Sequence, residues 1–234
     1  NIDFDHPDVY SDLSAVQQAF VALQKKSNLT IINADDPASS VLARSENVVM
    51  FGYSKELSTL KLQVPGKHNI LNAAAAIAAC QAIGITWEGI KRGLERFGGT
   101  KRRLEKLGEV RGAYVYDDYA HHPKEIEATI AALRDMYPKK RLIVVFQPHT
   151  YSRTKALLHN FSRALAQADI ALVTDIYASA RETQKEDGLA KQLGGLYAPT
   201  RKDVTQWLTK ELKEGDVVVF MGAGDIYQWA RSIL

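Results

Sequence analysis

The second half of the sequence repeats one pattern, a short apolar run followed by a segment with helical spacing, and this pattern constrains the fold most. Four apolar runs have the length of buried strands: residues 113–116, 142–146, 170–174 and 217–221. The segments with helical spacing that follow them are 123–136, 155–167, 189–193 with 204–212, and 226–233. Alternating strands and helices predict an α/β fold, with a parallel sheet that carries helices on both faces.

The first part of the chain mixes helices with short strands and is less regular. Its expected helices are residues 14–24, 69–83 and 87–97, and its expected strands are 29–32, 48–51 and the alternating run 60–64. The last helix ends at Gly98-Gly99, because a glycine pair favours a break in regular structure. We therefore expect two domains, residues 1–98 and 99–234.

Composition excludes several classes of protein. A chain of 234 residues with 46% hydrophobic residues can bury a core, and its net charge of +3 is too small to indicate nucleic-acid binding. No apolar run is long enough for a membrane span, and the amino terminus has no signal-peptide pattern. Cys80 is the only cysteine, which excludes an intrachain disulfide and fits a reducing cytoplasm. A cytoplasmic protein without nucleic-acid or membrane partners is therefore expected.

Polar residues follow each expected strand of the second domain. The loops at these strand ends are residues 117–123, 147–154, 175–182 and 222–225. Ligands of parallel α/β sheets bind beyond the carboxyl ends of the strands. Because these loops carry histidines, arginines, carboxylates and a glycine-rich turn, they predict a site for anionic ligands.

Asn69 and Asn72 lie three residues apart at the start of an alanine-rich helix, so they share a face. Two neighbouring amides offer the donors and acceptors that recognise adenine. Alternatively, one asparagine caps the helix and the alanine face packs against a neighbouring element.

Two charged pairs lie near the expected strand at 113–116. Arg102 and Arg103 suit phosphate recognition, or form a solvated basic turn. At the strand end, Asp117 and Asp118 could hold ribose hydroxyls or a metal. The histidine pair that follows, residues 121–122, could orient a substrate or lie on a plain surface.

His149 and Arg153 lie four residues apart, after a strand and into a helix start. The guanidinium fork of Arg153 could bind a carboxylate. The alternative is an ordinary capping segment that begins at Thr150 or Ser152.

Two further motifs give weaker signals. The amino terminus groups one imidazole, His6, with the carboxylates of Asp3, Asp5 and Asp8, which suits Mg²⁺ or a solvated acidic terminus. Gly222-Ala223-Gly224 follows a strand and could cradle phosphate or permit a tight turn. The phosphate-binding pattern G-x-x-x-x-G-K-[ST] does not occur in the sequence.

Taken together, these segments resemble the Mur ligase family. The matching segments occur in the family's order and cover nearly the whole chain: Asn1–Asp8, Gly66–Ala76, Gly99–Arg103, Asp117–Pro123, Gln147–Thr154 and Gly222–Gly224. The resemblance implies that residues 1–98 are part of a central ATP-binding domain. It implies that residues 99–234 are a carboxyl-terminal Rossmann-like domain that binds an amino acid.

The resemblance implies ATP-dependent amide-bond formation with Mg²⁺ in peptidoglycan precursor synthesis. Residues 117–123 and 147–154 look like the branch of the family that adds L-alanine to UDP-N-acetylmuramate. The branch that recycles murein tripeptide shares the His-His-Pro loop but departs at residues 147–154, so it ranks second. A non-catalytic nucleotide-binding module is the third interpretation.

The resemblance also implies roles for individual residues. ATP would be bound by His68, Asn69, Asn72, Arg103 and Asp118. The acceptor amino acid would be surrounded by Tyr119, His121, His149 and Arg153. His6 would be a ligand of the second Mg²⁺, and catalysis would depend on Asp118, Arg103 and His6.

Three departures from the family pattern bear on activity. The domain that binds the UDP-sugar is absent, as are the phosphate-binding loop and the acidic Mg²⁺ ligand that precede this region in the family. The stretch 53–62 is shorter than usual, and the segment after Arg181 looks clipped. We therefore expect this chain by itself to fold but to be catalytically inactive.

Overall fold

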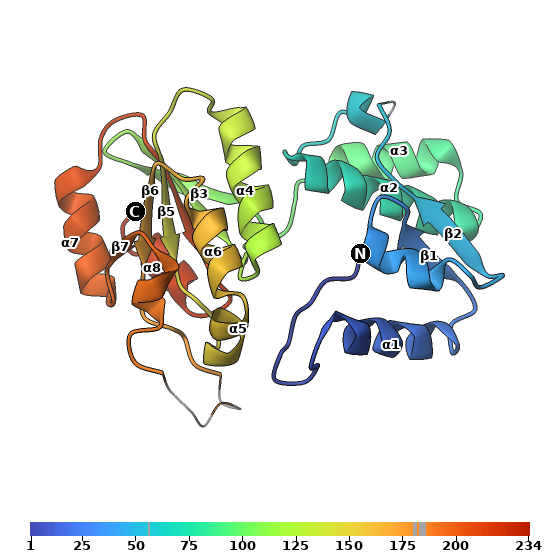
Figure 1. Cartoon of the computed structure of the whole chain (residues 1–234). Coiled ribbons are helices and arrows are strands. Elements are labelled where there is room, and N and C mark those ends of the chain that lie inside the picture. Colours follow the sequence, from blue (N-terminus) through green and yellow to red (C-terminus); the bar gives the residue numbers. More distant parts are fainter. Residues whose placement is uncertain (56, 180–181, 183–185) are drawn as a thin grey trace. The chain divides into compact units, whose positions relative to one another are not determined.

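The chain forms two compact units, residues 1–98 and 99–234, and the boundary in the sequence lies between Gly98 and Gly99. The structure is a computed structural model that describes residues 1–55, 57–179, 182 and 186–234 (Figure 1). Each unit is described by itself. No helix of the described residues is long and apolar enough to cross a membrane.

Unit 1 is built on a short parallel sheet of two strands, β1 (Thr30–Asn33) and β2 (Val48–Phe51). Its helical elements are α1 (Leu13–Gln24), η1 (Pro37–Leu42), η2 (Leu57–Thr59), α2 (Lys67–Ala82) and α3 (Trp87–Arg96). The Asp12 carboxylate caps α1 by accepting the Ala15 N–H at 2.8 Å. A small core groups the buried apolar residues Ile2, Val16, Ile32 and Leu42.

The strand expected at residues 60–64 is not present in the structure, which has bends and irregular backbone there. The alternation does describe burial, because Leu60, Leu62 and Val64 are partly buried while Lys61 and Gln63 are exposed. The backbone bonds of this segment are local, from the Leu60 N–H to the Leu57 carbonyl and from the Leu62 N–H to the Leu60 carbonyl. Alternation predicts which side chains are covered, whereas a strand also needs a neighbour to pair with.

Unit 2 contains a six-stranded sheet that confirms the expected α/β fold. The strand order is β3 (Glu105–Val110), β4 (Ala113–Asp118), β8 (Val217–Met221), β5 (Leu142–Phe146), β6 (Ile170–Val173) and β7 (Leu196–Tyr197). All neighbours are parallel except β3, which is antiparallel to β4. The edge strands β3 and β7 were not expected, since neither carries a run of apolar residues. The turn between β3 and β4 uses Arg111 and Gly112, both with positive φ.

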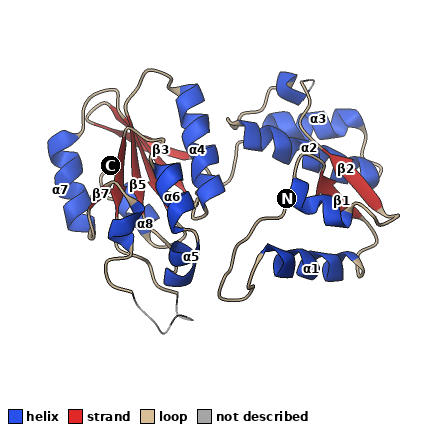
Figure 2. Ribbon diagram, in the orientation of Figure 1, coloured by secondary structure: helices blue, strands red, loops and turns tan. Residues whose placement is uncertain are grey.

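Helices cover both faces of this sheet, as the alternation predicts (Figure 2). The helices α4 (Pro123–Met136) and α6 (Leu158–Leu165) pack on one face. The helices α7 (Arg201–Glu211) and α8 (Ile226–Arg231) pack on the other. Every residue of β5 and β8 is buried, which explains why these strands read as continuous apolar runs.

The single helix expected at residues 155–167 is two shorter helices, α5 (Tyr151–Ala156) and α6. Leu157 interrupts them with φ −114° and ψ 19°, outside the helical region. The segment 189–193 forms only the 3₁₀ turn η3 (Ala190–Leu193). Helical spacing of apolar residues therefore predicts the covered face correctly but does not detect a break within it.

Candidate functional site

The candidate site lies at the carboxyl ends of β4, β8 and β5, which are neighbours in the sheet. After β5 the chain continues to α6 on one face, and after β8 it continues to α8 on the opposite face. Loops that leave neighbouring parallel strands toward opposite faces open a crevice at the strand ends, where ligands of α/β proteins bind. Six of the ten predicted site residues belong to this edge or to the loop that precedes β3: Arg103, Asp118, Tyr119, His121, His149 and Arg153.

Four aromatic rings form a continuous row across this edge. The ring centroids of Tyr119 and His121 are 5.2 Å apart, and those of His121 and His149 are 6.3 Å apart. Tyr177 ends the row, stacked on His149 at 5.8 Å with an interplanar angle of 16°. Because β8 lies between β4 and β5, His121 and His149 approach each other across the end of β8.

The glycine-rich turn after β8 makes room for this row. A Cβ atom on Gly222 would lie 2.7 Å from the carbonyl oxygen of Gln147. On Gly224 it would lie 2.6 Å from Cγ of the Tyr177 ring and 2.4 Å from Oε1 of Gln147. Carbon atoms do not approach so closely in real structures, so both positions require glycine. The turn is thus tight for a packing reason, whether or not phosphate also binds there.

The two imidazoles of the row have opposite preferred proton positions. Nδ1 of His121 lies 2.9 Å from the Tyr119 carbonyl oxygen, which can only accept, so Nδ1 carries the proton in this contact. Nδ1 of His149 lies 3.3 Å from the Arg153 guanidinium, which can only donate, so this Nδ1 accepts. When the rings are neutral, these contacts place the basic lone pair on Nε2 of His121 and hydrogen on Nε2 of His149. His122 serves the fold instead, because it caps α4 by accepting the Lys124 N–H at 3.4 Å.

Arg153 is 3% exposed and lies behind the row rather than on an open surface. Its guanidinium contacts both the ring and, at 3.3 Å, the carbonyl oxygen of His149. Neither Thr150 nor Ser152 caps α5 through its side chain. The Glu182 carboxylate does so instead, by accepting the N–H groups of Tyr151 at 2.9 Å and Ser152 at 2.8 Å. Arg153 is thus placed to fix His149 as well as to attract an anion.

Asp118 ends β4 as expected and is buried, and it organises the backbone around it. One carboxylate oxygen accepts the Leu104 N–H and the other accepts the Ala120 N–H, both at 2.7 Å. Burial raises the pKa of Asp118, against the two backbone hydrogen bonds and the positive charge of Arg103. The predicted ribose contact would use the remaining lone pairs of these oxygens, and it stays a prediction.

Asp117 is fully buried and forms an ion pair with Arg102, with its Oδ2 3.4 Å from Nε. Arg102 also donates to the Gly222 carbonyl at 2.6 Å, and its guanidinium packs over the rings of Tyr119 and Tyr227. Burial raises the pKa of Asp117 to about 6, and the charge of Arg102 only partly opposes this effect. This pair joins the loop before β3 to the ends of β4 and β8.

Arg103 is the more accessible arginine of the doublet, with 53% of its side chain exposed. Its guanidinium lies 3.4 Å from Glu125 and 5.4 Å from the centroid of the Tyr119 ring. Burial of Glu125 is outweighed by His121, by the His121 N–H and by Arg103, so its pKa is lowered and it stays ionised. A phosphate group approaching Arg103 would therefore compete with an existing ion pair.

The predicted adenine residues lie on the first turns of α2 in unit 1. Nδ2 of Asn72 donates to Oδ1 of Asn69 at 3.3 Å, which agrees with the expected shared face. Asn69 also donates to the Pro65 carbonyl at 2.7 Å. The capping alternative is wrong, because the N-cap of α2 is Gly66 and no side chain makes a cap hydrogen bond there. Asn72 is exposed, and His68 is partly buried one position before Asn69.

His6 lies before α1, away from α2 in sequence, with a positive φ of 55°. Its ring nitrogens lie 3.7 Å from Asp5 and 3.9 Å from Asp8, and its side chain is 59% exposed. Among the residues that the structure describes, no group of three or more histidine, cysteine, aspartate or glutamate side chains is arranged to hold a metal ion. His6 could therefore supply at most one protein ligand among waters and phosphate oxygens.

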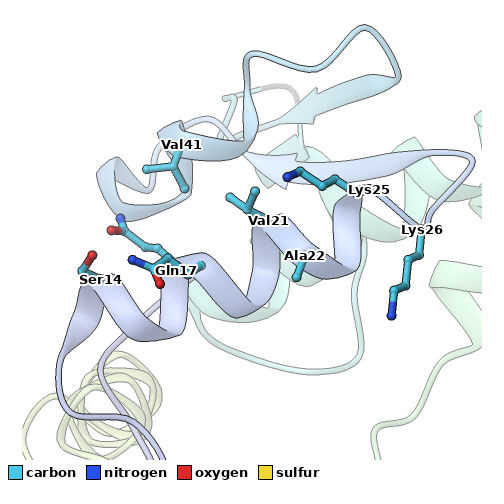
Figure 3. Close-up of a pocket in the computed structure, with 8 residues that line it drawn as sticks. Ser14, Gln17, Val21, Ala22, Lys25, Lys26 and Val41 are labelled. Atoms are coloured by element: carbon cyan, nitrogen blue, oxygen red, sulfur yellow. The ribbon is translucent and has the colours of Figure 1, made fainter.

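A separate hollow of about 550 Å³ lies in unit 1 between α1 and η1 (Figure 3). It is lined by Ser14, Gln17, Gln18, Val21, Ala22, Lys25, Lys26 and Val41. None of the predicted site residues lines this hollow.

The comparisons with known proteins identify the family. The sequence profile described as Mur ligase, glutamate ligase domain, matches residues 102–224. The chain belongs to the Mur ligase family. The matched region spans unit 2 from Arg102 to the glycine-rich turn, and it includes the aromatic row and the Asp117–Arg102 pair.

Curated Mur ligases match the whole chain. Proteins named UDP-N-acetylmuramate–L-alanine ligase from Desulfitobacterium hafniense, Aquifex aeolicus and Salinibacter ruber are 36%, 35% and 37% identical to it. The matches cover 100% of this chain and 60%, 59% and 58% of those proteins, so the chain spans about 60% of their length. The alignments extend over 271, 267 and 274 positions. They are longer than the 234-residue chain, which therefore has internal deletions relative to these Mur ligases.

Solved Mur ligases share the fold. The UDP-N-acetylmuramate–alanine ligase of Thermotoga maritima aligns with a TM-score of 0.72 at 28% identity, covering 98% of this chain and 56% of that protein. The murein peptide ligase of Psychrobacter arcticus aligns with a TM-score of 0.66 at 20% identity, covering 98% and 55%. The second match is informative about fold alone.

Several residues that organise this edge are not among the site residues predicted from the sequence: Arg102, Asp117, Glu125, Gln147, Tyr177 and Glu182. Asp117 and Arg102 each belong to a doublet whose other member was preferred, and no pattern in a single sequence tells the buried member from the accessible one. Tyr177 was visible only as a member of a strand-end loop. The clipped segment after Arg181 includes positions outside the described residues.

Proposed function

We propose that the protein containing this chain is an ATP-dependent ligase that joins L-alanine to UDP-N-acetylmuramate in peptidoglycan precursor synthesis in the cytoplasm. This chain supplies the amino-acid-binding domain and part of the ATP-binding domain. The observation that carries the proposal is the meeting of His121, His149 and Arg153 at one sheet edge, on motifs characteristic of the L-alanine-adding branch. The names of the curated relatives support the same substrates.

The chemistry proposed for the edge is the binding of a small zwitterion. Cationic Arg153, fixed beside His149, provides positive potential for a carboxylate. Neutral His121, with its basic lone pair on Nε2, can accept the one proton that an ammonium group must lose before it acts as a nucleophile. The buried carboxylate of Asp118 holds the backbone of this edge in place, and that of Asp117 pairs with Arg102.

Each unit carries residues that are proposed to bind ATP. Asn72 and Asn69 offer their amides to adenine, with His68 beside them, and Asp118 and Arg103 are assigned to ribose and phosphate. Mg²⁺ would neutralise charge on the phosphates when bound, and His6 is its proposed protein ligand. The exposed amide of Asn72 and the accessible guanidinium of Arg103 fit these assignments.

The alternative substrate is murein tripeptide, since the His-His-Pro loop is shared by that branch. Residues 147–154 favour L-alanine. A non-catalytic nucleotide-binding module is the alternative from another class, because the chain lacks a phosphate-binding loop motif.

Phosphate release by the full-length gene product tests these alternatives. The protein is supplied with ATP, Mg²⁺ and UDP-N-acetylmuramate, and then with L-alanine or with tripeptide. Release that requires L-alanine supports the proposal. Release that requires tripeptide supports the recycling branch, and nucleotide binding without any release supports the binding module.

A further inference from the structure

Tyr177 occupies a position at the candidate site that no role assigned so far uses. It lies in the loop after β6, and its backbone is tied to the loop after β5 in both directions. The Tyr177 N–H donates to the Pro148 carbonyl at 2.8 Å, and the Tyr177 carbonyl accepts the Thr150 N–H at 3.1 Å. These bonds make a parallel bridge between His149 and Tyr177, so the tyrosine backbone is fixed to the same loop that carries His149.

The side chain of Tyr177 is fixed as well. One contact is the stacked ring of His149 at 5.8 Å. The other is the backbone of Gly224, where a Cβ would lie 2.6 and 2.7 Å from ring atoms. The side-chain amide of Gln147 holds this glycine turn. Its Nε2 donates to Asp225 at 2.8 Å, and its Oε1 accepts the Ile226 N–H at 3.2 Å.

A ring held in this way cannot move aside for a ligand without breaking contacts on two loops. The residue is nevertheless 42% exposed, so a ligand at this edge can reach part of it. Among the described residues its hydroxyl makes no hydrogen bond, which leaves ring volume as the property that the position supplies. A rigid, partly exposed ring next to a histidine of the proposed amino-acid site is a steric boundary.

We infer that Tyr177 sets the upper size limit on the side chain of the incoming amino acid, and that Gly224 is glycine because any larger residue would displace this ring. The inference rests on the proposed function, since it concerns the amino acid bound beside His149 and Arg153. The substrate class it selects is a small α-amino acid such as glycine, alanine or serine, against branched ones such as valine.

The test compares kcat/KM for L-alanine and L-valine in the full-length gene product, with phosphate release as the readout. In Tyr177→Ala we expect the L-valine to L-alanine ratio to rise by about 10-fold or more, because rejecting a few methylene groups sterically is worth about that much. Tyr177→Phe is the matched control, since it keeps the ring and loses only the hydroxyl, and its ratio should stay at the wild-type value. The KM for ATP should be unchanged in both.

Tyr177→Val provides a second truncation, and it places a β-branched residue, which favours extended backbone, at this position. A wild-type ratio in both folded truncations would overturn the inference, as would an equal rise in Tyr177→Phe. Loss of turnover with every amino acid in both folded truncations would also overturn it, because the ring would then serve catalysis rather than size. Absence of L-alanine-dependent phosphate release in the wild type would instead refute the proposed function.

Discussion

Individual side chains at the sheet edge divide into those that hold the loops and those that face a ligand, and the arginine doublet illustrates the division. Arg102 is held by Asp117, the Gly222 carbonyl and two tyrosine rings, whereas Arg103 is half exposed beside Glu125. Arg102 and Leu104 also have positive φ, a strained conformation for residues with side chains. The contacts of Arg102 and Asp118 offset that strain and present Arg103 outward.

Asn72→Ala tests adenine recognition. Asn72 is exposed, so its removal should not disturb the core, but a lost amide contact should raise the KM for ATP about 10-fold. The measurement is ATP kinetics of the full-length gene product, with thermal unfolding as the check on folding. Asn69→Ala is expected to lower stability too, because Asn69 also binds the Pro65 carbonyl. Unchanged ATP kinetics in Asn72→Ala would leave the pair with only its structural contacts, to each other and to the Pro65 carbonyl.

Arg153→Lys tests the carboxylate contact. Lysine keeps the charge but lacks the planar fork that reaches His149 and an anion together. We expect kcat/KM for L-alanine to fall about 10- to 100-fold and the KM for ATP to change little. Steady-state kinetics with each substrate varied in turn provide the measurement. Equal losses for both substrates would assign Arg153 to the fold or to phosphate.

The buried Asp117 predicts a specific pH dependence of stability. Its pKa is raised from 3.8 to about 6 in the folded protein, so the folded state binds the proton more tightly than the unfolded state. Stability therefore falls as pH rises from about 4 to about 6, by at most about 3 kcal/mol, and the loss stays in place above pH 6. In Asp117→Asn this slope should be absent, so the stability of the variant relative to wild type should increase across that window.

The measurement is urea unfolding of both proteins at several pH values between 4 and 8. Trp207 and Trp229 lie in unit 2 and Trp87 in unit 1, so a Trp87→Phe background makes tryptophan fluorescence report on unit 2. A stability difference between the two proteins that does not vary with pH would mean that Asp117 titrates with an ordinary pKa.

At the scale of elements, the short helix α5 depends on a side chain from another loop. Its first N–H groups are accepted by Glu182, which belongs to the loop after β6. Because α5 follows directly from His149 and contains Arg153, Glu182 connects two strand-end loops at the proposed amino-acid site.

Glu182→Gln should therefore weaken the position of α5. We expect a stability loss of about 1 kcal/mol and a higher KM for L-alanine, since the charge at a helix amino terminus is lost. Glu186→Gln is the matched control, because the carboxylate of Glu186 forms an exposed ion pair with Lys155 at 2.8 Å. Thermal unfolding and L-alanine kinetics of both variants measure the difference. Equal effects in the two variants would mean that the cap does not position the site.

At the scale of the whole molecule, the chain consists of two units with separate cores. Unit 2 has a six-stranded sheet covered on both faces, whereas unit 1 has two paired strands. Unit 1 should unfold first, because a smaller sheet and core bury less apolar surface.

The 234-residue chain by itself should fold without turning over ATP. Phosphoryl transfer needs a lysine and backbone amides around the β- and γ-phosphates, and the sequence lacks the motif that supplies them. We expect weak nucleotide binding by calorimetry and no phosphate release above background with ATP, Mg²⁺, L-alanine and UDP-N-acetylmuramate. Circular dichroism checks the fold. Turnover by the purified chain would contradict the argument that phosphoryl transfer requires the phosphate-binding motif that this sequence lacks.

The sequence by itself determined the parallel α/β sheet of unit 2 and the loops that carry the site. Continuous apolar runs such as 142–146 and 217–221 are typical of central strands in a parallel sheet, and the carboxyl ends of parallel strands share one edge. Local patterns also located α1, α4 and the asparagine pair, because caps and helical periodicity act over a few residues.

Only the tertiary structure decided which member of each polar doublet is buried and which ring meets which. The loops after β4 and β5 bring His121 toward His149 across the end of β8, and the loop after β6 brings Tyr177 onto the same histidine. These contacts join residues far apart in the chain. Strand order and the packing of loops against one another are set by the whole core, whereas sequence patterns report only the preferences of short segments.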